Sequence, residues 1–106
     1  LFDAGTAVSG SGPAFVYYFI DALAKAGVAQ GLPPEQAVTL AVQTTVGAAK
    51  MVEAEKADPA VLAQKVATPG GCTAAGLDVL KTKGLDEALR DTIGATVDKA
   101  RAFANK

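Results

Sequence analysis

The chain has 106 residues, half of them apolar, with 10 basic and 11 acidic side chains and a formal net charge of −1. This length suits one domain with a core, and a balanced charge without a basic run argues against a nucleic-acid partner. The chain contains no histidine, which excludes a histidine base, a histidine metal ligand and a Ser-His-Asp triad.

Cysteine usage and the start of the chain indicate its setting. Cys72 is the only cysteine, so an intrachain disulfide is impossible, and a cytoplasmic location is expected. No cluster of metal ligands is present, so we expect no metal site. The chain begins with Leu1, and no signal peptide follows. We therefore expect that residues 1–106 come from inside a longer polypeptide.

The pattern of apolar residues predicts an all-α fold with five helices and no strand. Proline suits the first turn of a helix and glycine suits its end. The first helix is expected from Pro13 to Val28, with Gly27 and Gly31 ending it, and the second from Pro34 to Glu55. Three shorter segments complete the prediction: a helix capped by Asp58, a helix opened by Gly70-Gly71, and a last helix after Gly84.

For two of the shorter segments, the sequence predicts which side chains face the interior. The helix after Asp58 is expected to turn Val61, Leu62 and Val66 inward. The last helix carries an apolar stripe with a spacing of nearly four residues, so one face packs and the other is solvated. The stripe consists of Leu85, Leu89, Ile93, Val97, Ala100 and Ala104.

The first two helices are too apolar for a small domain to cover. Residues 14–20 are apolar or aromatic on every side of the helix, although the run is too short to span a membrane. The second helix has no charge from Val38 to Ala49, and its small residues Gly47, Ala48 and Ala49 allow close helix approach. The excess apolar surface predicts a homodimer or a higher homo-oligomer. The alternative is a tightly packed monomeric core.

The segment from Thr68 to Leu77, with the sequence TPGGCTAAGL, is the strongest candidate for a site. Pro69, Gly70 and Gly71 favour a tight turn, after which Thr73 falls in the first turn of a helix. The first amides of a helix lack intrahelical partners and attract anions. We therefore expect a carboxylate or phosphate near the Gly71, Cys72 and Thr73 amides. The alternative is an ordinary turn and helix cap.

Two other candidate motifs have simpler structural roles. Gly10-Ser11-Gly12 begins a dinucleotide fingerprint, but Phe15 occupies the position of the third glycine and no strand precedes it. Ser9, Ser11 and Gly12 are expected to cap the first helix instead. Cys72 lies near a helix start, which favours the thiolate, but without a histidine to activate it we interpret it as a small packing residue. On the helix surfaces, Asp21, Lys25, Lys50 and Glu53 are candidates for ion pairs.

Several segments together resemble the pyrroline-5-carboxylate reductase family, in the family's order and over nearly the whole chain. These segments are Pro59–Leu62, Val66–Lys81, Ser9–Phe15, Gly31–Pro33 and Gly47–Met51. The resemblance implies that residues 1–106 form the C-terminal helical domain for dimerisation and substrate binding, which intertwines with that of a second subunit. It implies that the N-terminal Rossmann domain, which holds NADP or NAD, is absent from this chain.

The same resemblance implies an activity. Reductases of this family reduce 1-pyrroline-5-carboxylate to L-proline, the last step of proline biosynthesis, with hydride from NADPH or NADH. Thr73 is then the catalytic residue, through a hydrogen bond to the ring nitrogen of the imino acid. Substrate-binding positions implied with it are Thr68, Gly70, Gly71 and Cys72, with Ser11 as a weaker candidate. The fragment alone is expected to be inactive.

A second hypothesis is a helical dimerisation module without a catalytic role. It explains the apolar first and second helices equally well, but it leaves the complete motif around Thr68–Thr73 unexplained. A membrane-surface protein is a weaker alternative, because no helix shows a basic face.

Overall fold

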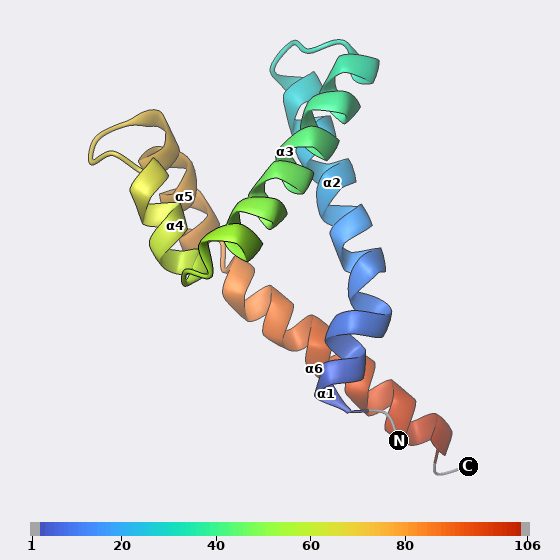
Figure 1. Cartoon of the computed structure of the whole chain (residues 1–106). Coiled ribbons are helices and arrows are strands. Elements are labelled where there is room, and N and C mark those ends of the chain that lie inside the picture. Colours follow the sequence, from blue (N-terminus) through green and yellow to red (C-terminus); the bar gives the residue numbers. More distant parts are fainter. Residues whose placement is uncertain (1–2, 105–106) are drawn as a thin grey trace. The chain divides into compact units, whose positions relative to one another are not determined.

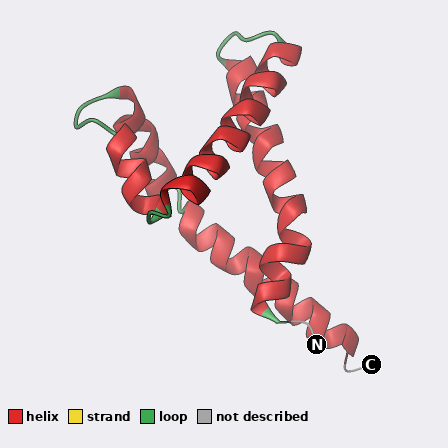
Figure 2. Ribbon diagram, viewed as in Figure 1, coloured by secondary structure: helices red, strands yellow, loops and turns green. Residues whose placement is uncertain are grey.

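The computed structural model describes residues 3–104, and every regular element among them is helical (Figures 1 and 2). The elements are α1 (Ala4–Thr6), the π-helical turn η1 (Ala7–Ser11), α2 (Gly12–Ala29), α3 (Pro34–Glu55), α4 (Pro59–Val66), α5 (Cys72–Thr82) and α6 (Leu85–Ala104). Because α1, η1 and α2 follow one another without a break, the described residues contain five helical segments. The predicted all-α fold is confirmed.

The chain divides into two compact units, which are described separately. One comprises Ala14–Leu62, with most of α2, all of α3 and the start of α4. The other comprises the described residues of Leu1–Pro13 and of Ala63–Lys106, with α1, η1, the end of α4, α5 and α6.

The first helical segment begins at Ala4, about two turns before the predicted start at Pro13. Asp3 is its N-cap: the carboxylate oxygen Oδ1 accepts hydrogen bonds from the Thr6 amide at 2.9 Å and the Thr6 hydroxyl at 3.1 Å. The backbone hydrogen bond from Thr6 lowers the pKa of Asp3. The expectation that Ser9, Ser11 and Gly12 cap the helix is therefore wrong, since all three lie inside the helical segment.

The π-helical turn η1 lies directly before Gly12-Pro13. Proline has no N–H to donate and its ring crowds the carbonyl four residues earlier, so an unmodified α-helical ladder is strained at this point. The wider π-helical turn supplies a local break in the α-helical register ahead of the proline. Within it, the Ser9 hydroxyl donates to the Gly5 carbonyl at 2.9 Å. Pro13 is thus accommodated inside a helix rather than starting one.

Helices α2 and α3 form a hairpin whose contact consists of small residues. Ala24, Ala37 and Ala41 are buried, with Ile20 and Leu32 packed against them. A Cβ at Gly27 would lie 3.0 Å from Leu32 Cδ1, so glycine makes room for the leucine. The helix continues through Gly27 to Ala29, and the chain then turns at Gly31, whose φ is +110°.

Helices α3 and α4 end and begin at positions that the sequence predicted. α3 runs from Pro34 to Glu55 and is closed by Lys56, which adopts the left-handed conformation with φ of +51°. The Asp58 carboxylate accepts from the Ala60 amide at 2.9 Å, which confirms the predicted cap of α4. The predicted inward orientation is wrong for two valines, because Val61 is 49% exposed and Val66 is 68% exposed.

In the other unit, η1 packs against α6, and the Ala7 side chain is fully buried. α5 meets α6 through a turn at Gly84, whose φ of +78° favours glycine. The predicted stripe of α6 is partly covered: Ile93, Val97 and Ala100 are half-buried, whereas Leu89 is 48% exposed.

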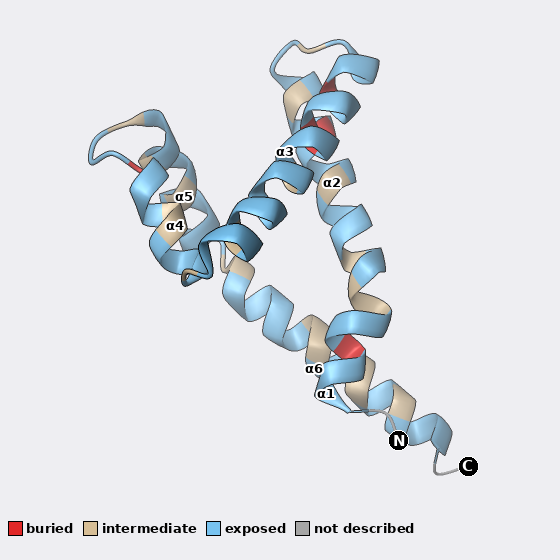
Figure 3. Ribbon diagram, in the orientation of Figure 1, coloured by how far each residue is buried: buried red, intermediate tan, exposed pale blue. Residues whose placement is uncertain are grey.

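Most of the described ribbon is coloured as exposed (Figure 3), and many large apolar side chains are among the exposed residues. Among the described residues, the buried apolar side chains are all alanines: Ala7, Ala24, Ala37, Ala41 and Ala67. Tyr17 and Tyr18 on α2 are 69% and 78% exposed, and Phe19 is 45% exposed. A tightly packed monomeric core is therefore wrong for this part of the chain. The described residues show the excess apolar surface from which self-association was predicted.

Replacing Lys56 by glycine is expected to stabilise the protein by about 0.5–1 kcal/mol, because only glycine occupies the left-handed region without a steric cost. The midpoint of urea unfolding, measured at constant protein concentration, would report the gain. The matched control is Lys65→Gly, within helix α4, which should lower stability by about 0.5–1 kcal/mol. Equal losses from both substitutions would contradict the left-handed assignment of Lys56.

Candidate functional site

The loop between α4 and α5 is a tight turn closed by its own backbone. The Thr68 amide donates to the Val66 carbonyl at 3.3 Å, and the Gly71 amide donates to the Thr68 carbonyl at 2.8 Å. Gly70 between them has a φ of +77°, which favours glycine. A Cβ at Gly71 would lie 3.0 Å from the Thr68 carbonyl oxygen. Both glycines are thus required by the geometry of this turn.

Helix α5 begins with backbone amides that point out of its first turn. Gly71 is the N-cap and provides no side-chain cap. The helical ladder starts with the bond from the Ala75 amide to the Gly71 carbonyl at 3.1 Å. Within residues 3–104, the amides of Cys72, Thr73 and Ala74 therefore precede the first ladder bond and remain available to an anion.

This geometry corrects the predicted set of donors. The Gly71 amide was expected to face the ligand, but it is already bonded to the Thr68 carbonyl inside the turn. The Ala74 amide, which sequence reasoning missed, is free instead. The first three residues of any helix carry free amides. A sequence prediction that placed the start of α5 at Cys72 to within one residue would therefore have identified Ala74.

Two hydroxyl groups flank these amides. Thr68 and Thr73 are exposed, and neither hydroxyl forms a hydrogen bond within the described part of the chain. Threonines inside helices behave differently: the Thr45 and Thr92 hydroxyls donate to carbonyls four residues earlier, at 2.8 and 2.7 Å. Thr73 is the second residue of α5, so the residue four positions earlier lies outside the helix and offers no helical carbonyl to its hydroxyl. Its hydroxyl is consequently available to a bound molecule.

Of the two remaining site candidates, Cys72 lies beside the free amides of α5 and Ser11 does not. Cys72 is an exposed free thiol at the first position of α5. Ser11 is half-buried in η1, which packs on α6, whereas the loop with Thr68 lies at the end of α5 remote from the α5–α6 turn (Figure 1). A single chain therefore does not bring Ser11 to the Thr68–Thr73 segment.

Residues 3–104 offer little support for other kinds of site. The described side chains form no group of three or more potential metal ligands. None of the helices in this range combines the length and the apolar character needed to cross a membrane.

Of the predicted surface pairs, Lys25 and Asp21 form an ion pair at 2.8 Å, and the hydrogen bond to Asp21 raises the pKa of Lys25. Lys50 and Glu53 form no ion pair among the described residues.

Comparison with known proteins places this geometry in a family. The family model described as "Pyrroline-5-carboxylate reductase dimerisation" matches residues 1–103. The chain is 48% identical to the pyrroline-5-carboxylate reductase of Aquifex aeolicus over 101 residues, which are 95% of this chain and 38% of that protein. It is 45% identical to the reductase of Arabidopsis thaliana over 104 residues, 98% of this chain and 38% of that protein.

Solved structures agree with the sequence relatives. The 1-pyrroline-5-carboxylate reductase of Streptococcus pyogenes superimposes with a TM-score of 0.92 at 40% identity, over 95% of this chain and 39% of that one. The pyrroline carboxylate reductase of Plasmodium falciparum, solved with NADP bound, superimposes with a TM-score of 0.89 at 36% identity, over 93% of this chain and 38% of that one. The chain thus spans less than half the length of these relatives. By sequence and by fold, it belongs to the pyrroline-5-carboxylate reductase dimerisation family.

Proposed function

We propose that residues 1–106 are the C-terminal dimerisation and substrate-binding domain of an NAD(P)H-dependent pyrroline-5-carboxylate reductase, which makes L-proline in proline biosynthesis. The observation that carries this proposal is the start of α5. Three free amides and two unpaired hydroxyls are gathered there by a turn of two glycines. Its chemistry suits a small carboxylate with a polar nitrogen beside it.

The amides would hold the substrate carboxylate. The Cys72, Thr73 and Ala74 N–H groups carry the positive end of the α5 dipole and need no movement to receive an anion. Gly70 and Gly71 keep the turn compact, and Thr68 either shapes the loop or donates to the carboxylate. Fixing the carboxylate in this way positions the imine carbon of the ring for reaction.

Thr73 would orient the ring nitrogen. A protonated imine nitrogen carries an N–H that the Thr73 oxygen accepts, which favours the charged form that receives hydride at the adjacent carbon. Hydride forms the new C–H bond, and the C=N electron pair moves to nitrogen to give the amine of L-proline. A threonine hydroxyl is a poor acid, so the role assigned to Thr73 is orientation and proton relay.

The hydride donor would come from elsewhere in the protein. The relative from Plasmodium falciparum was solved with NADP bound, whereas the described residues here contain no strand and no dinucleotide fingerprint. A nicotinamide dinucleotide, NADP or NAD, would therefore be held mainly by an N-terminal Rossmann domain. The half-buried Ser11 would contribute to the pocket only in that assembled protein. The expected setting is the cytoplasm.

The helical hairpin would supply the contact between subunits. The exposed Tyr17, Tyr18 and Phe19 on α2 and the uncharged middle of α3 form an apolar surface that a second copy can cover. In this proposal the two domains intertwine. A helical dimerisation module without catalysis remains the alternative. A strand followed by G-x-G-x-x-G upstream of Leu1 favours the reductase, and absence of this motif favours the module.

The chain is expected to form a homodimer at micromolar concentration. Tyr18→Asp should shift it toward monomer in sedimentation equilibrium, because the substituted charge would be buried at the interface. Ala95→Asp adds the same charge to an exposed position of α6 and should leave the dimer intact. A stable wild-type monomer with Phe15 and Phe19 buried internally would disprove the dimer.

The 106-residue chain alone should show no NADPH-dependent reduction of pyrroline-5-carboxylate. A pocket without its hydride donor cannot turn over. Loss of absorbance at 340 nm, with and without substrate, is the measurement. Substrate-dependent oxidation of NADPH by the purified chain would show that the assignment of the domains is incorrect.

Thr73→Val in the full-length enzyme should lower kcat/KM by about tenfold to a hundredfold. The substitution keeps the shape and deletes a hydrogen bond to a charged group, which contributes roughly 1.5–3 kcal/mol. Thr73→Ser should lose much less. Thr82→Val at the other end of α5 is the matched control.

A purely structural role for Thr73 makes a different prediction. A helix cap would give lower thermal stability with nearly normal turnover, so the melting temperature and kcat/KM should be measured on every variant. Full activity of the valine variant would remove Thr73 from the substrate site.

A further inference from the structure

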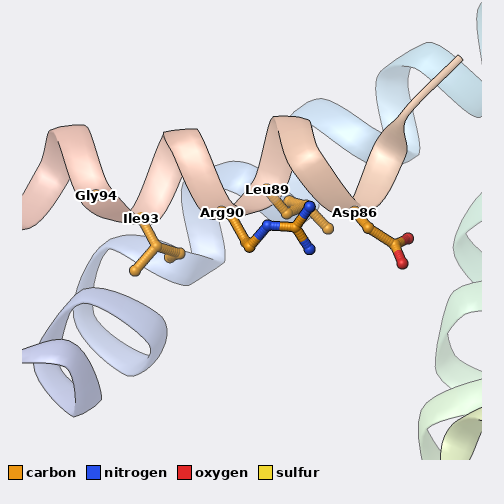
Figure 4. A pocket seen from close by; sticks show the side chains of 5 residues that line it. All are labelled: Asp86, Leu89, Arg90, Ile93 and Gly94. Carbon is orange, nitrogen blue, oxygen red and sulfur yellow. The ribbon is translucent and has the colours of Figure 1, made fainter.

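One face of α6 carries a shallow apolar depression with a charge of each sign. The depression is lined by Asp86, Leu89, Arg90, Ile93 and Gly94, all from α6 (Figure 4). Leu89 is 48% exposed, and a Cβ at Gly94 would meet nothing within 4 Å. Figure 4 shows the Asp86 and Arg90 side chains beside the two apolar ones. Neither the loop site nor the α2–α3 hairpin uses these residues.

The two charges on this face are not paired with each other. Asp86 and Arg90 are four residues apart, a spacing at which helical ion pairs form readily. Among the described residues, however, the ion pair present is that of Lys25 with Asp21. The carboxylate and the guanidinium of α6 are therefore both available to partners outside the chain.

We infer that this face of α6 binds the same face of α6 in a second copy of the chain, antiparallel across a two-fold axis at Leu89. With the axis there, Leu89 lies opposite its own copy, and Leu85 lies opposite Ile93 of the other chain. Asp86 and the other chain's Arg90 are then offset by two residues, about 3 Å along the helix, which an arginine side chain spans. The two-fold axis forms the Leu85–Ile93 and Asp86–Arg90 contacts twice each.

The charges select this orientation. A parallel pairing places Asp86 against Asp86 and Arg90 against Arg90, and like charges across an interface are unfavourable. The antiparallel pairing turns both repulsions into attractions. The patch is too small to hold two chains together alone, so the inference rests on the self-association proposed for the α2–α3 hairpin.

Charge reversal in the full-length protein tests the contact. Asp86→Arg alone and Arg90→Asp alone should each weaken self-association by about tenfold in sedimentation equilibrium, because each creates two like-charged pairs. An equimolar mixture of the two variants, exchanged by incubation, should recover the wild-type affinity, since each mixed pair again contains opposite charges. Circular dichroism checks that helix content is unchanged.

Two controls distinguish a contact between chains from a pairing within one chain. Glu87→Arg, one residue along α6, should not affect association. The double variant D86R/R90D recovers under either an intermolecular or an intrachain pairing, so recovery by the double variant with no recovery by the mixture would overturn the inference. Single variants that associate like wild type would overturn it and leave the proposed dimer intact. A monomeric wild-type protein would instead refute the proposed dimer itself.

Discussion

The described residues of one chain bury little apolar surface, and the other properties of this fold follow from that shortage. The described residues bury only alanine side chains, while many larger apolar side chains remain exposed, among them Tyr17, Tyr18 and Phe19 on α2, Val38, Leu40, Val42 and Val46 on α3, and Leu89 on α6. Alanine contacts let helices approach closely but remove little area from water, and burial of apolar area is the main force that stabilises a fold. The chain belongs to a dimerisation family, and in the dimer proposed here a second copy would cover this apolar surface.

The candidate site depends on a different constraint, the geometry of one turn. The bond from the Gly71 amide to the Thr68 carbonyl leaves no space for a side chain at Gly71, and Gly70 supplies the left-handed residue. The two glycines end the turn where α5 begins. The amides of Cys72, Thr73 and Ala74 therefore lie side by side in the first turn of the helix without backbone partners. The hydroxyl of Thr73 is free because the residue four positions earlier, whose carbonyl it could bond within a helix, lies outside α5. Position within the helix, more than residue type, thus makes Thr73 a candidate for chemistry.

The proposed division of labour links these two constraints. A domain built from helices with small residues at their contacts leaves wide apolar faces exposed, and the start of α5 follows a turn that is held by two backbone hydrogen bonds of its own. Subunit association would therefore not need to build the anion site, only to surround it. The described residues contain no strand, and the chain spans 38% and 39% of two reductase relatives; in this proposal another domain would hold the dinucleotide.

The sequence alone determined the helices, the cap at Asp58, and the turns at Gly70 and Gly84, because these depend on local propensity and backbone freedom. It also indicated the apolar excess. Only the tertiary structure decided three features. The first helical segment begins at Ala4, with Asp3 as its cap, since a π-helical turn admits Pro13. The Gly71 amide is bonded inside the turn, so the free amides at the start of α5 are those of Cys72, Thr73 and Ala74. Val61 and Val66 lie exposed, because what covers a helix face depends on residues distant in the chain or in another copy.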